Sequence, residues 1–491
     1  MASHPAASPP PPVPESIHAL DHEIRSHWPS IQHLLTELLD ITPPARDAPL
    51  THHSTPQDIT RIRRWARPGP PQPLETVIGE ARAIFDHRVR INHPLFFGFI
   101  PSGTIQLSWV GDMLMAAFNA HGGGRKVGLG PCVVEEELLR WLAARLGLPA
   151  RTAGGVFVSG GSVANLMSIA VARDQKLDGD RQAARGVIYL SERAHYAVAK
   201  MARVLGFVDR QIHRVRCSEA FELDVEDLKE QLVADRRQGL VPFMIVATCG
   251  YTETGTGDPV EDLADIARRE SLWLHVDGAY GASMALSHAH AHLVAGLGAA
   301  DSVAWDAHKW LFSSFGCGML LARDRDHLRS TFGVHSELMD QQSGGLSEQP
   351  EPWDLSVELT RPARAMSLWF MLRVLGEERI GRMIDYGIYM ADSVQARLQA
   401  REGWEILTTA KRGIVTFRYN PGPCSEEDLD GVNTTISDTL VEDNLAGIFS
   451  VRVSGVVSLR VCCITTRLSE EDIDRLIQQI DMTAKEVTKH F

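Results

Sequence analysis

The sequence contains no run of apolar residues long enough to form a membrane helix. Crossing a bilayer takes about 18 or more consecutive apolar residues, and no stretch of this 491-residue chain approaches that length. Cysteine is scarce as well: the seven cysteines are odd in number and scattered, and they include no C-x-x-C pair. This pattern argues against a disulfide framework and a structural zinc site. We therefore expect no membrane partner and no bound metal.

Basic residues are fewer than acidic residues in this sequence. The chain has 49 Lys and Arg against 62 Asp and Glu, a formal net charge of −13. A surface of this sign repels phosphate backbones, so nucleic acid is not expected as a partner. A basic and apolar secretory leader is also missing, because residues 1–15 are rich in proline. Together with the cysteine usage, this predicts a cytoplasmic protein.

The overall composition is that of a soluble globular protein, with 44% hydrophobic and 23% charged residues. At about 150 residues per domain, the length leaves room for about three structural units. The Pro-rich start is of low complexity and cannot bury enough apolar surface to offset its ordering entropy. The predicted organisation is a disordered tail (1–15), an N-terminal helical segment (16–90), a large α/β domain (91–365) and a small α+β domain (366–491).

Short apolar runs alternate with helical patterns between about residues 155 and 325, which is typical of βαβ units and a mainly parallel sheet. The predicted strands are Gly155–Val158, Val187–Leu190, Phe243–Thr248, Leu272–Val276, Ser302–Trp305 and Gly318–Leu321. The predicted helices between them are Val163–Gln175, Tyr196–Leu205, Val225–Arg236 and Val260–Arg268. After residue 365 the pattern predicts a long helical region to Gln399, strands at Ile414–Tyr419 and Val457–Cys463, and a helix from Ser469.

A glycine-rich segment follows the first predicted strand, at Ser159-Gly160-Gly161-Ser162. Ligands of parallel sheets bind where strands end and helices begin. Glycine lets the backbone approach an anion closely, and a helix N-terminus offers N–H groups and a positive dipole. The segment suits a phosphate, although a plain turn capped by Ser162 explains it as well. It matches neither G-x-x-x-x-G-K-[ST] nor G-x-G-x-x-G, so a nucleoside triphosphate or dinucleotide is not indicated.

Three further residues at strand ends have unusual surroundings. His195 could stack on an aromatic ligand or transfer protons near neutral pH, and a satisfied structural histidine is its simpler interpretation. Asp277 ends a buried strand, where its charge needs a helix cap, a pyridinium N–H or a metal to offset desolvation. Lys309 lies between His308 and Trp310, and an amine in a partly desolvated pocket is a competent Schiff-base nucleophile.

Together, a phosphate cup, a stacking ring, a carboxylate and a Schiff-base lysine are what a protein supplies to bind pyridoxal 5′-phosphate. In this combination Asp277 would keep the pyridine nitrogen protonated, so that the ring can accept electrons released at the substrate Cα. His195 would cover one face of the ring, and the small side chain of Ala279 would leave room on the other.

The residues from about 76 to the C-terminus resemble the group II pyridoxal-phosphate-dependent amino-acid decarboxylases. The segments that carry the resemblance are His93-Pro94, Phe97 to Pro101, Gly154 to Asn165, Ala194-His195, Ala247-Thr248, Thr254-Gly255, Asp258-Pro259, His275 to Tyr280 and Asp306 to Trp310. The resemblance implies the PLP-dependent transferase fold (fold type I), with a mainly parallel seven-stranded sheet, and a homodimer that acts on an amino acid.

The resemblance also implies roles for individual residues. Lys309 corresponds to the Schiff-base lysine, Asp277 to the partner of the ring nitrogen and His195 to the stacking ring. Positions on the phosphate side are Gly160, Gly161, Ser162 and His308, and positions beside the cofactor are Thr248 and Ala279. Arg361 and Arg364 resemble the entry to the family's C-terminal domain, where a structural role is implied.

The sequence departs from the family pattern in the loop that normally carries a proton-donating tyrosine. The stretch from Asp326 to Glu358 contains no tyrosine; Leu338 stands near the expected position, and His335 is the obvious substitute acid. General-acid help is worth about two to four orders of magnitude in rate. A second departure is Phe315-Gly316-Cys317-Gly318, where relatives have Tyr-Asp-Cys-Gly.

These observations predict a carboxy-lyase that converts an L-amino acid to its amine and carbon dioxide. One alternative is decarboxylation-dependent oxidative deamination to an aldehyde, because the loop tyrosine is missing. Another is a non-catalytic homologue with a binding role. The segment Phe96–Phe99 matches a family segment that borders the substrate, which favours an apolar or aromatic substrate. The histidines of Ser287–His292 are interpreted as a solvated loop rather than a metal site, because alternate residues of a helix point apart.

Overall fold

The computed structural model describes residues 25–41, 46–100, 103–333 and 350–490, which form parts of two compact units, Met1–His93 and Pro94–Phe491. The first unit contains the helices α2 (Trp28–Ile41), α3 (Pro56–Trp65) and α4 (Leu74–Asp86). The predicted tail 1–15 lies outside the described residues. Within the described ranges, no helix is both long and apolar enough to span a bilayer.

The second unit is built on a seven-stranded sheet with the order β1-β7-β6-β5-β4-β2-β3. Neighbouring strands are parallel except at β7, which runs antiparallel to both β1 and β6. Its strands are β1 (Gly154–Val158), β2 (Gly186–Ser191), β3 (Ile212–Val215), β4 (Val241–Thr248), β5 (Trp273–Asp277), β6 (Ser302–Asp306) and β7 (Gly318–Ala322). The predicted mainly parallel α/β sheet is thus confirmed.

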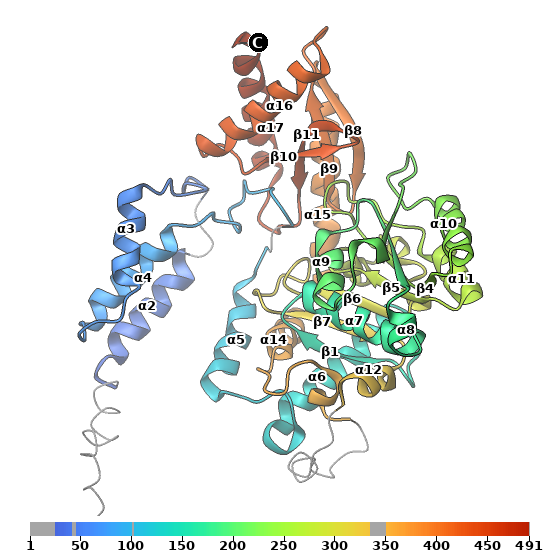
Figure 1. Cartoon of the computed structure of the whole chain (residues 1–491). Helices are drawn as coiled ribbons and strands as arrows, with labels where there is room; N and C mark the ends of the chain where they lie inside the picture. The colour runs from blue at the N-terminus through green and yellow to red at the C-terminus, as the bar shows by residue number, and fades with distance from the viewer. Residues whose placement is uncertain (1–24, 42–45, 101–102, 334–349, 491) are drawn as a thin grey trace, which may run out of the picture. The chain divides into compact units, whose positions relative to one another are not determined.

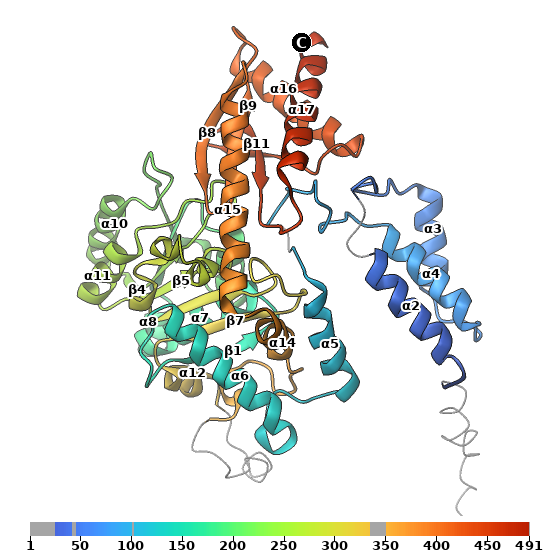
Figure 2. The same cartoon turned by 180° about the vertical axis from the view of Figure 1, so that it is seen from behind.

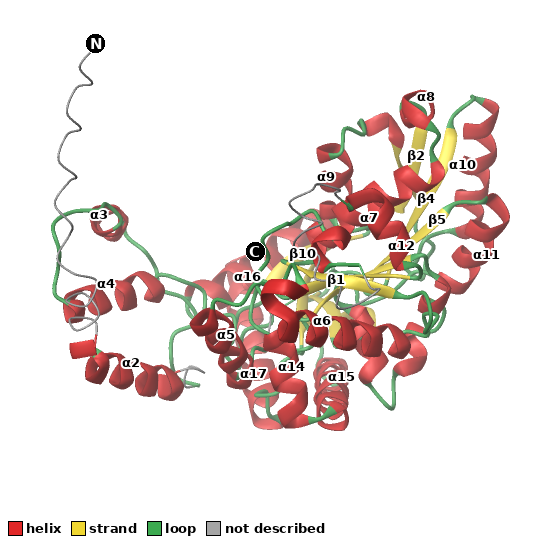
Figure 3. Cartoon of the chain, turned by 90° about the horizontal axis from the view of Figure 1, so that it is seen from below, coloured by secondary structure: helices red, strands yellow, loops and turns green. Residues whose placement is uncertain are grey.

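Helices cover both faces of this sheet (Figures 1 and 3). Because successive side chains of a strand point to opposite faces, each strand contributes to two separate cores: Leu274 and Val276 of β5 belong to one, and Trp273 to the other. The core that contains Trp273 is formed with α7 (Gly161–Lys176) and α9 (Tyr196–Val204). The opposite core is formed with α6 (Arg125–Arg145), α10 (Val225–Arg237), α11 (Val260–Glu270) and α14 (Ala365–Leu375). Strands buried on both faces explain the continuous apolar runs seen in the sequence.

The structure differs from the sequence-based prediction in two of these elements. The edge strand β3 was not predicted, because it has only four residues and its central pair, His213 and Arg214, is polar and partly exposed. The predicted long helical region up to Gln399 is two helices, α14 and α15 (Glu377–Gln399). They are separated by Gly376, whose φ of 76° lies in the left-handed region that favours glycine.

A second, antiparallel sheet with the order β10-β11-β9-β8 forms the C-terminal part of this unit. Figure 2 shows α15 running from the large sheet to the small one. Its strands are β8 (Trp404–Lys411), β9 (Ile414–Tyr419), β10 (Phe449–Val453) and β11 (Val456–Cys462), with α16 (Glu426–Glu442) and α17 (Glu470–Val487). Ser469 caps α17 in a capping box with Asp472, which confirms the predicted helix start. The predicted boundary at residue 365 stays a prediction.

Shorter elements complete the second unit. The remaining helices are α5 (Gln106–Phe118), α8 (Gly179–Ala183) and α12 (Arg325–Phe332), with the 3₁₀ turns η1 (Asp209–Gln211), η2 (Gly281–Leu286), η3 (Ala291–Val294), η4 (Leu297–Ala299), η5 (Pro352–Leu355) and η6 (Thr488–His490). Of the histidines between residues 287 and 292, His290 contacts Asp385 through Nδ1 and Oδ1 at 3.1 Å.

A buried ion pair holds the strand that leads into the glycine-rich segment. Arg361 is fully buried, and its Nη2 donates to Glu135 Oε1 at 2.7 Å and to the carbonyl of Phe157 at 2.6 Å. Glu135 Oε1 also accepts the Phe157 N–H at 3.0 Å. Arg361 therefore ties α6 to β1, which agrees with the structural role that the resemblance implies.

We expect Arg361→Met to lower the free energy of unfolding by about 3–5 kcal/mol, because Glu135 would remain buried without its counter-charge. Denaturant unfolding followed by tryptophan fluorescence measures this loss. The control is Arg382→Met, which breaks an exposed ion pair with Glu378 and should cost about 1 kcal/mol or less. Equal losses for the two variants would contradict the structural role.

Candidate active site

A cavity of about 430 Å³ opens where β1, β4, β5 and β6 end. It brings together all the predicted cofactor residues, from segments far apart in the sequence. These residues are Gly160, Gly161, Ser162, His195, Thr248, Asp277, Ala279, His308 and Lys309. His335, the predicted substitute acid, lies outside the described residues. The cavity is also lined by residues that the sequence analysis did not single out, among them Asn165, Tyr251, Thr252 and Asp306.

One end of the cavity is a backbone cradle at the start of α7. The N-cap residue is Gly160, and no side chain caps the helix, so the turn is not the Ser162-capped one considered above. A Cβ atom added at Gly161 would lie 3.1 Å from Asp306 Oδ2 and 3.2 Å from Ala279 Cβ. Glycine thus keeps open a concave surface at the positive end of a helix dipole, which suits a phosphate group.

Lys309 and His308 reach this cradle from the turn after β6. The Lys309 Nζ lies 3.3 Å from Asp306 Oδ2, and the His308 Nε2 lies 3.6 Å from the same oxygen. Burial lowers the pKa of His308, although Asp306 acts in the opposite direction. Asp306 therefore orients the amine that the sequence analysis identified as the nucleophile.

Among the described residues, three buried polar atoms of the residues that line this cavity have no hydrogen-bond partner: His308 Nδ1, Asp306 Oδ1 and Thr248 Oγ1. Such atoms are rare in folded proteins. A polar ligand in the cavity would supply partners for these atoms, and the cradle and the cavity chemistry fit pyridoxal phosphate.

Asp277 lines the same cavity from the tip of β5, and it is 8% exposed. Its Oδ1 accepts the Ala279 N–H at 3.2 Å, and its Oδ2 accepts Asn165 Nδ2 at 3.0 Å. Asn165 in turn contacts His275, whose Nε2 lies 2.8 Å from the Asn165 amide oxygen. Two protein donors thus orient a carboxylate that still faces the cavity.

His275 is fully buried, and burial lowers its pKa from 6.5 to about 4. Folding therefore favours the neutral ring, so this residue contributes stability above about pH 6.5 that is lost as the pH falls towards 4. The change in pKa corresponds to roughly 3 kcal/mol. We expect the unfolding free energy of the wild type to decrease more steeply between pH 6.5 and 4 than that of His275→Gln. Parallel pH profiles for the two proteins would contradict this assignment.

His195 serves the fold and faces the cavity at the same time. It is the N-cap residue of α9, and its Nδ1 accepts the Ala197 N–H at 3.3 Å. Its ring is exposed towards the cavity, yet the surrounding protein atoms lower its pKa by desolvation, against the opposing charge of Asp277. The structural interpretation of this histidine is confirmed, and its role as a stacking ring stays a prediction that its place in the cavity wall allows.

A buried carboxylate outside the predicted set shapes the loop after β4. Asp258 Oδ2 accepts the Thr248 N–H at 2.7 Å, and its Oδ1 accepts the Leu223 N–H at 2.8 Å and the Tyr251 hydroxyl at 2.5 Å. Burial raises the pKa of Asp258 to about 6. Asp258 thereby fixes Thr248 and Tyr251 in the cavity wall. The signal in the sequence was the Asp258-Pro259 pair, which the resemblance included without a role.

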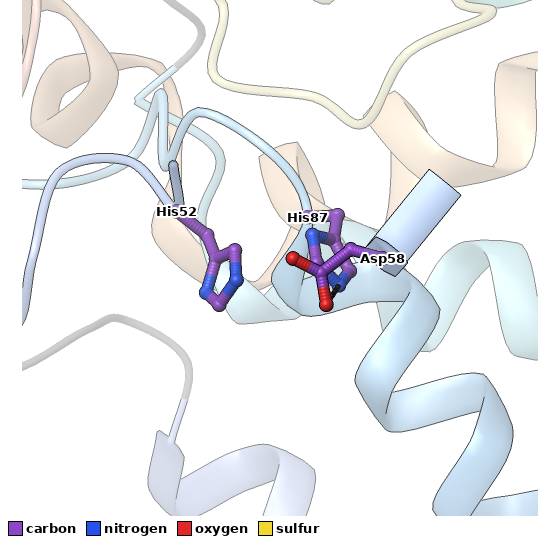
Figure 4. A group of neighbouring side chains, drawn as sticks. All are labelled: His52, Asp58 and His87. Atoms are coloured by element: carbon purple, nitrogen blue, oxygen red, sulfur yellow. Dashed lines mark ion pairs between the residues drawn. The ribbon is translucent and has the colours of Figure 1, made fainter. Parts of the chain in front are cut away.

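Outside the cavity, one group of described residues has the composition of a metal site: His52, Asp58 and His87 of the N-terminal unit (Figure 4). However, both Asp58 oxygens already accept protein donors. Oδ2 accepts the Thr55 N–H at 2.9 Å, and Oδ1 accepts Arg61 Nη2 at 2.6 Å. The Thr55 hydrogen bonds lower the pKa of Asp58 to about 2. The capping box of α3 and its ion pair account for this cluster.

A phosphate cradle, an amine, a carboxylate and an imidazole around one cavity, at the strand ends of a mainly parallel sheet, define a pyridoxal-phosphate enzyme. Residues 56–420 match the pyridoxal-dependent decarboxylase conserved domain. The chain therefore belongs to the pyridoxal-dependent decarboxylase family. Relatives of the chain are amino-acid decarboxylases, and the chain is a carboxy-lyase.

Individual relatives agree with this assignment. The chain is 34% identical over 408 residues to an aromatic-L-amino-acid decarboxylase of Bacillus atrophaeus, which covers 83% of this chain and 84% of the relative. It is 28% identical over 428 residues to the cysteine sulfinic acid decarboxylase of Homo sapiens, covering 84% of this chain and 86% of the relative. Among solved structures, Oryza sativa TDC with PLP and tryptamine superposes with a TM-score of 0.89 at 25% identity, over 96% of this chain and 99% of that one.

Proposed function

We propose that the protein decarboxylates an aromatic or apolar L-amino acid to the corresponding amine, with the cavity residues in the roles that the sequence predicted. The observation that carries these roles is that all the predicted cofactor residues of the described chain line one cavity. Pyridoxal phosphate, when bound, supplies an electron sink for the charge left by the departing carboxylate.

Each residue of the cavity wall would hold a different part of the cofactor. The amine of Lys309 would hold the cofactor aldehyde, and Asp306 at 3.3 Å orients that amine. Asp277 would hold the proton of the pyridine nitrogen, and His195 would cover the ring. Gly160, Gly161, Ser162 and His308 would bind the phosphate, with Thr248 and Ala279 beside the ring.

The scarcity of positively charged residues in the cavity wall supports a substrate with an uncharged side chain. None of the described residues that line it is an arginine, and the one lysine among them is Lys309. Desolvation lowers the pKa of the two lining histidines, His195 and His308, which favours their neutral forms. An acidic side chain would thus find no dedicated partner in these walls. The greater identity to the aromatic decarboxylase than to the cysteine sulfinic acid decarboxylase, 34% against 28%, points the same way.

The aromatic segment predicted to border the substrate is only partly accessible. Phe96 and Phe97 are buried, whereas Phe99 is 62% exposed and stacks on Phe449 with ring centroids 5.1 Å apart. Phe99 is therefore the exposed aromatic ring of this segment, and it is not among the residues that line the cavity of this chain.

A panel of L-amino acids tests the substrate class. The purified protein with added pyridoxal phosphate is incubated in air with tryptophan, tyrosine, phenylalanine, leucine, glutamate and cysteine sulfinate, and products are identified by mass spectrometry. We expect the highest kcat/KM for one of the first four, with the amine as product. A preference for glutamate or cysteine sulfinate would overturn the substrate class and leave the decarboxylase assignment intact.

The second candidate is oxidative deamination to an aldehyde, favoured by the absence of tyrosine between residues 326 and 358. Aldehyde, ammonia and hydrogen peroxide with consumption of oxygen would establish it. In the amine-forming reaction, His335 is the predicted donor of the proton to Cα. His335→Gln should then lower the rate of amine formation by about a hundredfold or more. An unchanged rate would exclude His335 as the donor. The third alternative, a non-catalytic homologue, does not agree with the complete set of cavity residues.

We further propose a cytoplasmic homodimer. The helices α5 and α6 carry apolar side chains with large exposed fractions, which an interface would cover. They are Met113 (43%), Leu114 (37%), Phe118 (78%), Val127 (60%), Leu129 (48%) and Val133 (42%). The seven cysteines are free, in keeping with a reducing compartment. Sedimentation equilibrium should give twice the chain mass, and a monomeric mass at micromolar concentration would reject the dimer.

A further inference from the structure

A single helix, α7, contributes to the phosphate cradle and also contacts Asp277. Its first residue, Gly161, belongs to the phosphate cradle. Asn165, one turn further on, is 1% exposed and donates its Nδ2 to Asp277 Oδ2 at 3.0 Å. The side chain that orients the Asp277 carboxylate is therefore attached to the same rigid element that forms the phosphate cradle.

Asn165 is itself fixed by a chain of buried hydrogen bonds. Its amide oxygen lies 2.8 Å from His275 Nε2, and His275 Nδ1 lies 2.9 Å from Ser302 Oγ. Ser302 Oγ also accepts the indole N–H of Trp273 at 2.9 Å and lies 2.8 Å from Ser168 Oγ. None of these side chains is more than 1% exposed.

The hydrogen-bonding capacities of these groups determine the orientation of the chain. A carboxylate only accepts, so the Asn165 NH₂ faces Asp277 and the amide oxygen faces His275. His275 must then carry its proton on Nε2, and neutral Nδ1 must accept the Ser302 hydroxyl. The low pKa of the buried ring agrees with this neutral form. A rotated Asn165 would place its amide oxygen against the Asp277 carboxylate and its NH₂ group against the Nε2–H of His275.

Local periodicity explains how these residues meet. Trp273, His275 and Asp277 alternate along β5 and so share the face of the sheet that α7 covers. On α7, Asn165 and Ser168 are three residues apart and lie on one face of the helix. Polar side chains of β5 thus face polar side chains of α7 across an otherwise apolar interface. An unpaired polar group in this interface would lower the stability of the fold.

We propose that Asn165 and His275 are positioning residues that fix the Asp277 carboxylate for the pyridine nitrogen of the cofactor, with the Ser302 hydroxyl donating to Nδ1 of the Nε2–H form of His275. The inference rests on pyridoxal phosphate as the cofactor of this cavity and does not depend on the identity of the amino-acid substrate.

The decisive variant is Asn165→Asp, which keeps the shape of the side chain but turns a donor towards Asp277 into an acceptor. Cofactor affinity is measured without substrate, by titrating the apoprotein with pyridoxal phosphate and following its absorbance. Loss of a hydrogen bond to a charged group predicts a dissociation constant about tenfold to a hundredfold higher than that of the wild type. We also expect the pH at which the bound cofactor changes its absorbance to move, because Asp277 no longer directs the ring nitrogen.

Asn433→Asp is the matched control. Asn433 is equally buried in α16, and its Nδ2 donates to the carbonyl oxygens of Tyr419 and Leu429, far from the cavity in the C-terminal sheet. The same chemical change there should lower stability and leave the cofactor dissociation constant within about twofold of the wild type. Equal cofactor binding by Asn165→Asp and Asn433→Asp would overturn the proposal.

The role of His275 is tested by non-additivity. His275→Leu should weaken cofactor binding by about threefold to tenfold, and its combination with Asn165→Asp should bind no more weakly than Asn165→Asp alone, because His275 acts through Asn165. Fully additive losses would contradict that order. In the wild type, ¹⁵N chemical shifts of the imidazoles, with His275 assigned through His275→Gln, should show a protonated Nε2 and an unprotonated Nδ1. The opposite tautomer would overturn the proposal even where a variant fails to fold.

Discussion

Replacing Lys309 by alanine is expected to abolish turnover and to remove the absorbance of the covalently bound cofactor. Lys309 supplies the one primary amine in the described wall of the cavity, 3.3 Å from Asp306 Oδ2, and alanine has no nucleophile to replace it. Loss of an essential nucleophile costs roughly three to six orders of magnitude in kcat. Steady-state kinetics with saturating pyridoxal phosphate, together with the absorbance spectrum of the dialysed protein, measure both effects.

The control for this prediction is Lys229→Ala. Lys229 lies on α10 in an exposed ion pair with Glu226, and its removal should change neither the spectrum nor kcat by more than about twofold. If Lys309→Ala retained turnover and a cofactor that resists dialysis, another amine would have to be the nucleophile. The assignment of this cavity as the active site would then be wrong.

The second large effect is expected at Asp277. Asp277→Asn keeps the size of the side chain and removes the negative charge that would hold the proton of the pyridine nitrogen. Without that proton the ring accepts electrons poorly, and the loss of one such electrostatic contribution predicts a decrease in kcat of about a hundredfold to a thousandfold. The measurement is kcat at saturating pyridoxal phosphate, so that weaker cofactor binding does not account for the loss.

Asp277→Glu separates charge from geometry. It keeps the negative charge on a longer side chain and should recover more activity than Asp277→Asn, provided that charge is what the site requires. Its carboxylate would no longer match the Ala279 N–H and Asn165, so full activity is not expected. An Asp277→Asn protein as active as the wild type would show that this carboxylate does not act on the cofactor.

Site residues that follow a buried strand can be predicted from the sequence, whereas residues that act through a distant partner cannot. Gly160, Asp277 and Lys309 each follow a recognisable buried strand, so their position at a strand end could be predicted from local hydrophobicity. Asn165 gave no such signal, because an asparagine in the first turns of a helix is common. Its function becomes visible only through Asp277, 112 residues away in the sequence.

The roles of Asp306 and Asp258 could not be predicted from the local sequence either. Asp306 was part of a recognised motif, but its position beside the Lys309 amine depends on the turn after β6. Asp258 lies in the loop after β4 and is held by backbone N–H groups from two separate segments. The predicted proton donor His335 lies outside the described residues, and its role stays a prediction.

The sequence by itself determined the α/β class with a mainly parallel sheet, because strands and helices follow from periodicities and propensities that act over a few residues. The cofactor was predicted from the chemistry of residues at the strand ends together with the family resemblance, and the roles of the individual residues stay predictions. Only the tertiary structure decided that β7 runs antiparallel between β1 and β6, and that Asn165, His275 and Ser302 join behind Asp277. Three of these pairings, β1 with β7, Asn165 with Asp277 and Asn165 with His275, join segments more than 100 residues apart in the sequence. Such pairings have no local signature, because they form only when the sheet brings the segments together.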